Sequence, residues 1–481
     1  MIQIGPVTID FNPLLEAVNR GLVYGMWYMF IHGGWIVIAF TLIAGFKDIW
    51  ILHLVRKAAS KWKWVLLAID VPAENIQSPR AVENILAHLA GAHMKADLIE
   101  KYFTGFSQEY FSLEIVSING FVQFYIYTPV HLRDLVESSI YAQYPSAQIT
   151  EAEDYTGSVP SKYPDPEWNL WGTEFVLSQN QAYPITTYES FEDETAEEAT
   201  FKDPMAALLE TMSSMRNGEQ LWLQITVTPI SHRSWQDKSF KLVEKLAGIP
   251  SEHNAGWFGK LLSIPHAIAV AIIDGLMPGE PAHDAHAKDE MPSKMLYLTP
   301  GEREVIEKIE EKAAKIGFET KIRSIYVSKK GVTNKGRGRF GIIGAMKQFT
   351  AEDLNGLKPD TTTVGTHAHY VFTELRKNLK RNRIIKAYKY RSNWRGMLPY
   401  VLNVEEIATL WHFPVAEAVK APLIKKAESK RAEPPHELPM EGSPHHGHGR
   451  RHGMGDHGPQ GHGVEPEHAL EEEVPDNLPV G

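Results

Sequence analysis

The chain has 481 residues, with 49 Lys and Arg against 59 Asp and Glu, a formal net charge of −10 at pH 7 and no cysteine. The acidic balance excludes a chain that is basic throughout, so any contact with nucleic acid must be local. The absence of cysteine excludes disulfides, thiolate metal sites and thiol catalysis, and the length allows two or three domains.

Residues 21–46 form an apolar run with no charged side chain between Arg20 and Lys47. As a helix this run is roughly 39 Å long at ~1.5 Å per residue, and a bilayer core needs only ~30 Å. We therefore expect a transmembrane helix over 21–46. A cleaved signal peptide is disfavoured, because it would carry positive charges at its start and a cleavage site at its end, and here only Arg20 precedes the run. A buried helix of a soluble protein is rarely uncharged for so long.

Basic residues are distributed unequally around this run. Only Arg20 precedes it. The basic residues that follow it closely are Lys47, Arg56, Lys57, Lys61 and Lys63. The positive-inside rule then predicts a single-pass protein of the inner membrane, with residues 1–20 outside and the bulk of the chain cytoplasmic. Residues 47–63 keep helical spacing and predict a juxtamembrane helix.

Residues 64–155 predict a compact α+β module. Asn119-Gly120 between two alternating apolar runs is a strong hairpin signal. Ser78 can cap a helix that has Pro79 at its first position and Val82 and Leu89 on its apolar face. The predicted strands are 64–72, 109–118, 121–129 and 147–151, with helices after Ser78 and over 131–144. This order of strand, helix, strand, strand, helix, strand is that of a ferredoxin-like sandwich.

A Pro/Ser/Gly-rich linker over 156–167 leads to a second module, 168–425. The predicted strands here are 170–177, 221–229 and 318–328, and the predicted helices are 205–215, 234–246, 300–315 and 402–414, the last capped by Asn403. The fold class is therefore α+β: a transmembrane helix, two ferredoxin-like α/β sandwich modules, and a disordered His/Gly/Pro-rich tail over 426–481. The apolar insertion 257–277 predicts either a helix at the bilayer surface or a buried helix.

Two segments of the second module are basic. Residues 331–338 have the spacing of a phosphate loop, but Arg337 and Gly338 replace the lysine and hydroxyl that hold phosphate and magnesium. Residues 376–395 mix cations with Tyr and Trp. Candidate contacts to nucleic acid or anionic lipid are Lys335, Arg337, Arg339, Lys380, Arg381, Arg383, Lys386, Lys389, Arg391 and Arg395. A solvated charged face is the other interpretation.

Histidine is the residue to consider for metals. The tail has His445, His446, His448, His452, His457 and His462 between glycines, which lacks a fixed geometry. His283, Asp284 and His286 form a smaller cluster, and His367 and His369 alternate along a predicted strand. We expect no metal site and no cofactor. Since no nucleophile–base motif occurs either, we expect no enzyme.

Four segments together resemble the N-terminal, membrane-anchored region of conjugative DNA-transfer (type IV secretion) ATPase-like proteins of uncultivated small-genome bacteria. They are VLLAIDVPAENIQSPRAVENILAHLAG, FSLEIVSINGFVQFYIYTPVHLRDLVESSIYAQYP, GEQLWLQITVTP, and VLNVEEIATLWHFP with the later KRAEPPHELP. The resemblance covers about residues 20–440 and extends weakly to the closing DNLPV. In the longer relatives a P-loop ATPase domain follows, which this chain lacks.

The resemblance implies a membrane scaffold or accessory subunit of a type IV secretion-like machine, which docks a separate ATPase or DNA. The alternative is a membrane-tethered regulator that binds nucleic acid or anionic lipid. The partners expected are the membrane, a P-loop ATPase, DNA and a second copy of the chain.

Overall fold

A computed structural model describes residues 2–4, 7–9, 12–71, 75–193, 200–201, 203–248, 298–415 and 430–431. The predicted insertion 257–277, the cluster around His283 and His286, and the tail 426–481 apart from Lys430 and Arg431 lie outside the described residues.

The apolar run near the N-terminus is broken into two helices. The elements here are β1 (Ile2–Ile4), β2 (Val7–Ile9), α1 (Asn12–Asn19), α2 (Leu22–Met29), a π-helical turn (Phe30–Gly34) and α3 (Trp35–Ala59). Within the turn, Gly33 adopts φ 117° and ψ −8°, a left-handed conformation that favours glycine and interrupts helical hydrogen bonding. The prediction of one transmembrane helix over 21–46 is therefore wrong in two respects: the helix is interrupted at Phe30–Gly34, and its second part extends beyond Phe46. Helix α3 starts after the kink and continues through the predicted juxtamembrane helix to Ala59.

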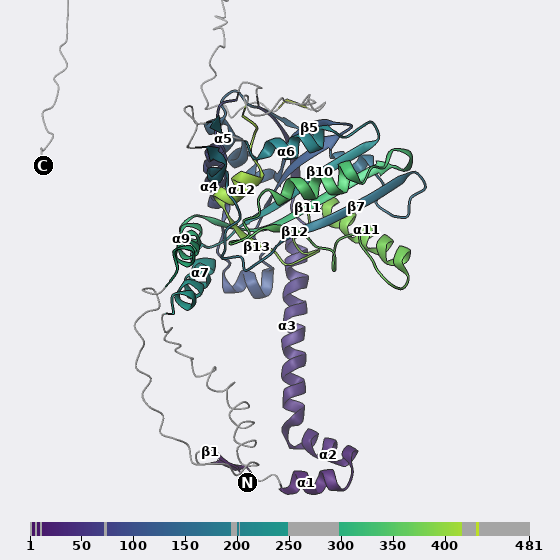
Figure 1. Cartoon of the computed structure of the whole chain (residues 1–481). Coiled ribbons are helices and arrows are strands. Elements are labelled where there is room, and N and C mark those ends of the chain that lie inside the picture. The colour runs from purple at the N-terminus through teal and green to yellow at the C-terminus, as the bar shows by residue number, and fades with distance from the viewer. Residues whose placement is uncertain are drawn as a thin grey trace, which may run out of the picture. The chain divides into compact units, whose positions relative to one another are not determined.

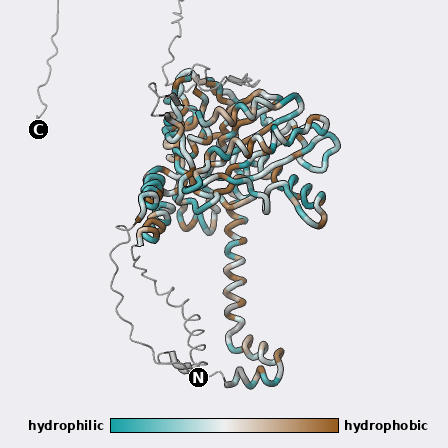
Figure 2. Tube along the Cα trace, in the orientation of Figure 1, coloured by the Kyte–Doolittle hydropathy of each residue, from teal (hydrophilic) through white to brown (hydrophobic). Residues whose placement is uncertain are grey.

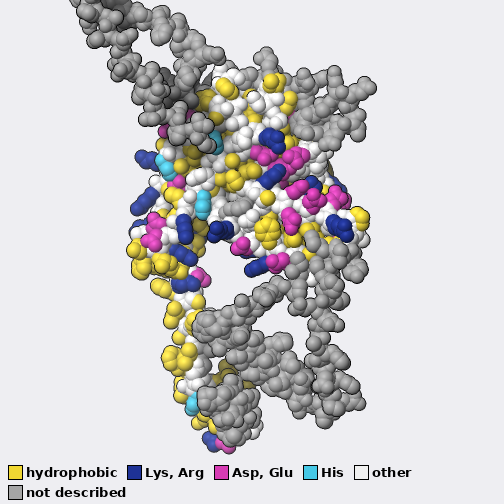
Figure 3. Space-filling model, turned by 90° about the vertical axis from the view of Figure 1, so that its left-hand side faces the viewer, with side chains coloured by type: hydrophobic (Ala, Val, Ile, Leu, Met, Phe, Trp, Pro, Cys, Tyr) yellow, Lys and Arg dark blue, Asp and Glu magenta, His cyan; other side chains and the backbone are white. Residues whose placement is uncertain are grey.

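Helix α3 is long and apolar enough, by length and composition, to cross a membrane. The candidate span is Ile38–Ala59, 22 residues, and little of its apolar part is buried. Large side chains such as Phe40, Leu42 and Phe46 are exposed. Hydrophobic residues run along most of this helix (Figure 2) and lie uncovered on the face shown in Figure 3.

The first half of the main body follows the predicted order. Its elements are β3 (Trp64–Asp70), α4 (Arg80–Leu89), β4 (Phe111–Ile118), β5 (Phe121–Pro129), α5 (Arg133–Gln143) and β6 (Gln148–Glu151). Asn119 and Gly120 make the hairpin turn with φ 55° and 90°, both positive as a type I′ turn requires. Pro79, not Ser78, precedes α4, without a side-chain cap.

The second half is longer and has more irregular connections. Its main elements are β7 (Trp168–Leu177), α6 (Met205–Ser213), β10 (Glu219–Pro229), α7 (His232–Leu246), α9 (Pro300–Ala314), β11 (Gly317–Lys329), α10 (Gly341–Lys347), β12 (Leu357–Pro359), α11 (Thr373–Lys389), β13 (Tyr400–Asn403) and α12 (Val404–Leu410). Short elements are η2 (Ala90–Ala92), η3 (Glu100–Thr104), η4 (Val130–Leu132), η5 (Tyr155–Ser158), η6 (Tyr188–Phe191), β8 (Glu192–Asp193), β9 (Thr200–Phe201), η8 (Lys330–Val332), η9 (Gly336–Phe340) and β14 (Lys430–Arg431). Asn403 caps α12, as predicted, in a reciprocal capping box with Glu406.

Both halves share one antiparallel sheet. The strand order is β12-β7-β11-β10-β4-β5-β3-β6-β14, and β13 pairs with β11 (Figure 1). The halves meet at β4 and β10, which pair from Gln220↔Ile118 to Val227↔Phe111. The sequence predicts two modules, but the pairing of β4 with β10 makes them parts of a single sheet.

Each face of this sheet carries its own core. On one face α4, α5, α6, α10 and α12 bury residues such as Phe124 and Trp411. On the other face α11 and the segment 155–163 bury Trp222 and Tyr388. Full burial of a large apolar side chain stabilises a fold by roughly 1.5–3 kcal/mol. The predicted linker 156–167 belongs to this second layer, because Val159 and Tyr163 are buried in it.

Candidate functional site: a basic pocket at the edge of the sheet

A pocket of about 320 Å³ lies beside the first residues of β7. Strand β12 pairs with β7 only from Phe175 to Leu177, so a loop and α11 complete the remaining edge. The pocket is lined by Asn169, Leu170, Trp171, Tyr326, Ser328, Thr333, Lys335, Arg339, Thr366, His367, Ala368, His369, Lys377 and Arg381. Three segments outside the sheet, residues 333–339, 366–369 and 377–381, therefore meet at this edge of the sheet.

Helix α11 contributes Lys377 and Arg381, which lie one turn apart. Arg381 Nε donates to the Leu170 carbonyl at 2.9 Å, an edge carbonyl of β7, and its Nη1 donates to Asn378 Oδ1 at 2.8 Å. Lys377 Nζ donates to Glu374 Oε1 at 2.8 Å, and the Glu374 side chain is 69% exposed. The Arg381 guanidinium is thus fixed in place, whereas Lys377 has a weak surface partner that a ligand can replace.

The glycine-rich segment after β11 supplies Lys335 and Arg339. The Tyr326 hydroxyl accepts a hydrogen bond from the Asn334 N–H at 2.9 Å. Gly338 packs so closely on the Tyr326 ring that a Cβ would lie 2.4 Å from it. Only glycine permits this approach, which brings both cations to the pocket.

This segment also has the surroundings of a phosphate loop, since it follows β11 and leads into η9 and α10. The chemistry of such a loop is still missing, because Arg337 and Gly338 occupy the positions of the lysine and the hydroxyl. Arg337 is instead paired with Glu219, from its Nη2 to Oε2 at 2.8 Å.

The loop 360–369 supplies two histidines and is held by Asp360. The Asp360 carboxylate accepts hydrogen bonds from the backbone N–H groups of residues 362–365, the shortest at 2.5 Å from Val364. Burial by itself would raise the pKa of Asp360, but these hydrogen bonds lower it below its ordinary value. The rings of His367 and His369 meet edge to face at 4.2 Å. The strand predicted here is wrong, since residues 367–369 form a loop.

The electrostatic character of the pocket is positive. None of the described residues that line it is acidic. The pKa of His367 is lowered, first by partial desolvation and then by positive neighbours. These neighbours are His369, Arg339, Lys377 and Lys380. Arg339 Nε is buried without a hydrogen-bond partner among the described residues. The site is therefore suited to an anion, and phosphate oxygens match the donors of Arg and Lys.

The predicted basic residues separate into three groups. Lys335, Arg339 and Arg381 line the pocket. Four others bind groups of the protein itself: Arg337, Lys380, Lys389 and Arg391. Arg337 pairs with Glu219, and Arg391 with Glu114. Lys380 donates to the carbonyls of Thr362 and His367, and Lys389 donates to the Val159 carbonyl and to Ser161. Arg383, Lys386 and Arg395 are exposed and do not line the pocket.

Arg391 lies in a buried network at the junction of the two halves. Its Nε and Nη2 donate to the two oxygens of Glu114 at 3.0 and 3.2 Å, and its Nη1 donates to Asp154 at 2.5 Å. Burial alone would lower the pKa of Arg391, but Glu114, Tyr155 and Asp154 raise it well above its ordinary value. A side chain in this position does not reach a surface ligand.

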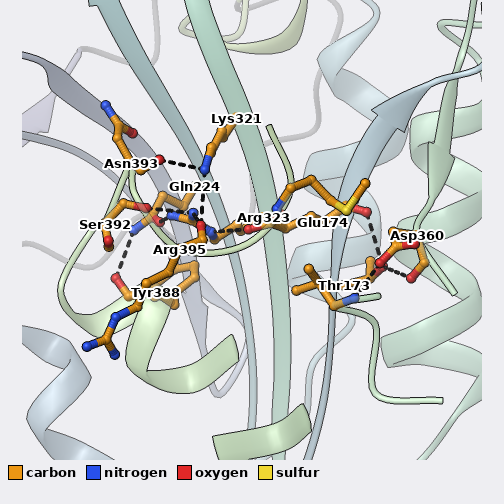
Figure 4. Close-up of polar contacts among 12 residues, drawn as sticks. Thr173, Glu174, Gln224, Lys321, Arg323, Asp360, Tyr388, Ser392, Asn393 and Arg395 are labelled. Carbon is orange, nitrogen blue, oxygen red and sulfur yellow. Dashed lines mark hydrogen bonds and ion pairs between the residues drawn. The ribbon is translucent and has the colours of Figure 1, made fainter. Parts of the chain in front are cut away.

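The same network continues across the sheet through Arg323, which Figure 4 shows between Glu174 and Gln224. Arg323 Nε donates to Glu174 Oε1 at 2.7 Å and Nη1 to Gln224 Oε1 at 3.2 Å. Its Nη2 donates to the carbonyls of Ser392 and Arg395, both at 2.7 Å. The network therefore fixes the loop after α11 against the sheet.

Sequence reasoning missed part of the pocket. The sequence marks His367, His369 and Lys377 only as members of patterns, and Trp171 and Tyr326 only as strand residues. No local signal shows that residues 366–369 lie against residues 335–339. Among the described residues, no group of three or more His, Asp or Glu is arranged to hold a metal ion.

Comparison with known proteins gives one family. A model described as "Domain of unknown function (DUF8128)" matches residues 71–420, more than two thirds of the chain, and includes every residue that lines the pocket. Comparison with curated proteins gives no match.

Proposed function

The chain belongs to the DUF8128 family, and for this member we propose a membrane-tethered protein that binds the phosphate groups of a nucleic-acid strand in the basic pocket beside β7. The observation that carries this proposal is the meeting of Lys335, Arg339, Lys377 and Arg381 around a pocket of about 320 Å³, where none of the lining residues that the structure describes is acidic.

The composition of the pocket favours a nucleic acid over a simple inorganic anion. The half-buried Trp171 lines it beside the cations, whereas the Tyr326 ring is covered by Gly338. Proteins that bind single strands combine cations for the backbone with aromatic rings for the bases. The pocket volume is at the lower end of the range for small-ligand sites, about 300–1,000 Å³, which suits about one nucleotide.

The tether is α3, and we propose that it spans the inner membrane with the sheet in the cytoplasm. Support comes from the uncharged first half of α3 and from the excess of Lys and Arg that follows this first half.

The chain has no cysteine, so single cysteines can be labelled directly to test this orientation. Asn19 and Ser138 are both exposed, so each can be replaced by a cysteine that a reagent can reach. An impermeant maleimide should label Asn19→Cys in intact cells, and Ser138→Cys only in inverted vesicles; the reverse result would contradict this orientation.

We also propose that each half of the sheet is a ferredoxin-like unit. Support comes from the strand order, which is β6-β3-β5-β4 in the first half and β12-β7-β11-β10 in the second. In both halves the first and third strands lie at the centre, and helices connect the first strand to the second and the third to the fourth.

The binding experiment uses the full chain in nanodiscs of zwitterionic lipid and a labelled single-stranded oligonucleotide. The double variant Arg339→Gln/Lys377→Gln removes two pocket cations that have no buried partner. We expect affinity to fall at least about tenfold and the slope of log K against log salt to fall by about 2, one for each phosphate that is no longer neutralised.

The matched control is Arg383→Gln/Lys386→Gln, which removes the same amount of charge from two exposed positions of α11 outside the pocket. Its affinity should stay within about twofold of the unchanged chain. Equal weakening in the two double variants, or no binding by the unchanged chain, would overturn the proposal. Competition by free nucleotide and by inorganic phosphate identifies which part of the strand is recognised.

The resemblance to conjugative-transfer proteins leads to a wider proposal, in which the tethered site serves a type IV secretion-like machine that includes a separate P-loop ATPase. Its support is the resemblance itself together with a site for nucleic acid. Co-purification of the full chain with such an ATPase from native membranes tests it, and a chain recovered consistently without one would count against it.

A further inference from the structure

Helix α11 leaves one face uncovered, and this face combines large apolar side chains with basic ones. Its buried face packs Ile384, Ile385 and Tyr388 on the sheet. The residues of the opposite stripe, at helical spacing, are Phe372, Leu375, Leu379, Arg383, Lys386 and Tyr390, all exposed. Phe372 is 75% exposed and Leu375 61%. A soluble surface helix would normally have polar side chains along this stripe.

The loop after α11 extends the same surface. Trp394 is 54% exposed and Leu398 86% exposed. The exposed Arg395 lies over the Tyr390 ring, 5.8 Å from its centre. Across 373–399 Glu374 is the one acidic residue, at the far end of the helix. We call the stripe together with Trp394, Arg395 and Leu398 the α11 surface.

The buried Arg391, which follows α11, is connected to the start of β3 through stacked side chains. The Arg391 guanidinium lies 4.3 Å from the centre of the Tyr127 ring. The Tyr127 ring stacks on Trp64 at 4.9 Å with an angle of 3° between the planes. Trp64 begins β3, five residues after α3 ends at Ala59. The start of this loop at Arg391 therefore lies near the point where the apolar helix joins the sheet, and residues 393–397 continue from there over β11 and β7.

We propose that the α11 surface binds the anionic lipid surface of the membrane in which α3 is embedded. The apolar side chains and Trp394 enter the interface, where aromatic rings are favoured. Arg383, Lys386 and Arg395 contact lipid phosphates, with their stems along the apolar stripe. This inference rests on the proposed span of α3, but not on the nucleic-acid site, which lies on a different side of α11.

Charge complementarity decides the occupant. A protein partner would require acidic side chains opposite three cations, whereas anionic lipid supplies that charge and an apolar interior together. Because α3 would hold the surface at the membrane, even weak contact becomes effectively intramolecular. The contact would orient the sheet relative to the bilayer.

The experiment uses the full chain in nanodiscs, with a single cysteine at Leu398→Cys carrying an environment-sensitive fluorophore. Lipids with a quencher on the acyl chain report contact. We expect quenching in discs with about a third phosphatidylserine and much weaker quenching in phosphatidylcholine alone, since each cation near an anionic surface strengthens binding about fivefold. Ser138→Cys on α5, which packs against the other face of the sheet, should show no quenching.

The charge variant Arg383→Glu/Lys386→Glu/Arg395→Glu should abolish the dependence on phosphatidylserine while oligonucleotide binding stays within about threefold of the unchanged chain. A second label at Phe40→Cys reports whether α3 is in the bilayer. Quenching at position 40 without quenching at 398 overturns this inference alone and favours a protein partner. Absence of quenching at both positions overturns the membrane tether and this inference with it. Equal quenching at 398 in both lipids overturns the role of the anionic headgroups.

Discussion

At the scale of single residues, the structure separates arginines that look alike in the sequence. Arg391 and Arg339 both belong to basic segments with neighbouring aromatic residues. Arg391 faces Glu114 and Asp154 in the core, whereas Arg339 lines the pocket and its buried Nε has no hydrogen-bond partner among the described residues. The position of a carboxylate from a distant strand decides which arginine is structural and which is available to a ligand.

Replacement of Arg391 should destabilise the protein strongly. In Arg391→Met, the Glu114 carboxylate keeps its buried position but loses its cation, which costs roughly 3–5 kcal/mol. The control Arg383→Met, at an exposed position of α11, should change stability by less than about 0.5 kcal/mol. Urea unfolding of the full chain in detergent, followed by tryptophan fluorescence, measures both. Equal stability of the two variants would show that the pair contributes little.

The titration of His367 reports the positive charge of the pocket. Its pKa is lowered because partial desolvation and the nearby cations disfavour the imidazolium. A bound phosphate should favour the imidazolium and raise the pKa, so by linkage the affinity for the anion increases as pH falls through the region at and below 6.5. NMR titration of the imidazole with and without oligonucleotide measures this shift. A pKa that is unchanged on binding would place the anion elsewhere.

At the scale of elements, two turns with positive φ determine how neighbouring segments are directed. Gly33 bends the apolar run before α3. Asn119 and Gly120 close the β4–β5 hairpin, whose tip also contacts the other half of the sheet: the Asn119 N–H donates to the Glu219 carbonyl at 3.0 Å. This hairpin therefore also links the two halves of the sheet.

Substitution of Gly120 should test that second role. In Gly120→Ala the residue must keep φ 90°, and its Cβ would lie 2.7 Å from the Met215 carbonyl oxygen. The left-handed conformation alone costs about 1–2 kcal/mol for a residue with a Cβ, and the backbone contact adds to it. Gly157→Ala is the control, because a Cβ there meets nothing within 4 Å. Thermal unfolding should separate the two variants, and a neutral Gly120→Ala would contradict the contact.

At the scale of the whole molecule, the two halves depend on each other. Strand β4 is one edge strand of the first half and β10 one edge strand of the second, and each covers the edge of the other. The network from Glu174 through Arg323 and Gln224 to Glu114 crosses the same junction. Separation would expose two strand edges and several buried charges at once.

Cutting the connection between the halves should therefore leave them together. A site for a specific protease, inserted between the exposed Gly157 and Ser158, allows cleavage of the folded chain. The fragments should elute together in detergent without denaturant and separate in urea, because the eight paired residues of β4 and the buried ion pairs hold them. The uncut insertion variant provides the reference elution volume. Fragments that separate under native conditions would show that the junction is weak.

The sequence by itself determined the α+β class, most helices and strands of both halves, and the apolar character of the N-terminal helix. These depend on local patterns: alternation in strands, helical spacing around Val82 and Leu89, the Asn119-Gly120 turn and the Asn403 cap. Only the tertiary structure decided that the halves join through β4 and β10, that Arg391 is buried, and that residues 335–339, 366–369 and 377–381 surround one pocket. The reason is physical. A local pattern specifies which face of an element is apolar, but which edges pair and which charges meet depends on residues far away in the chain.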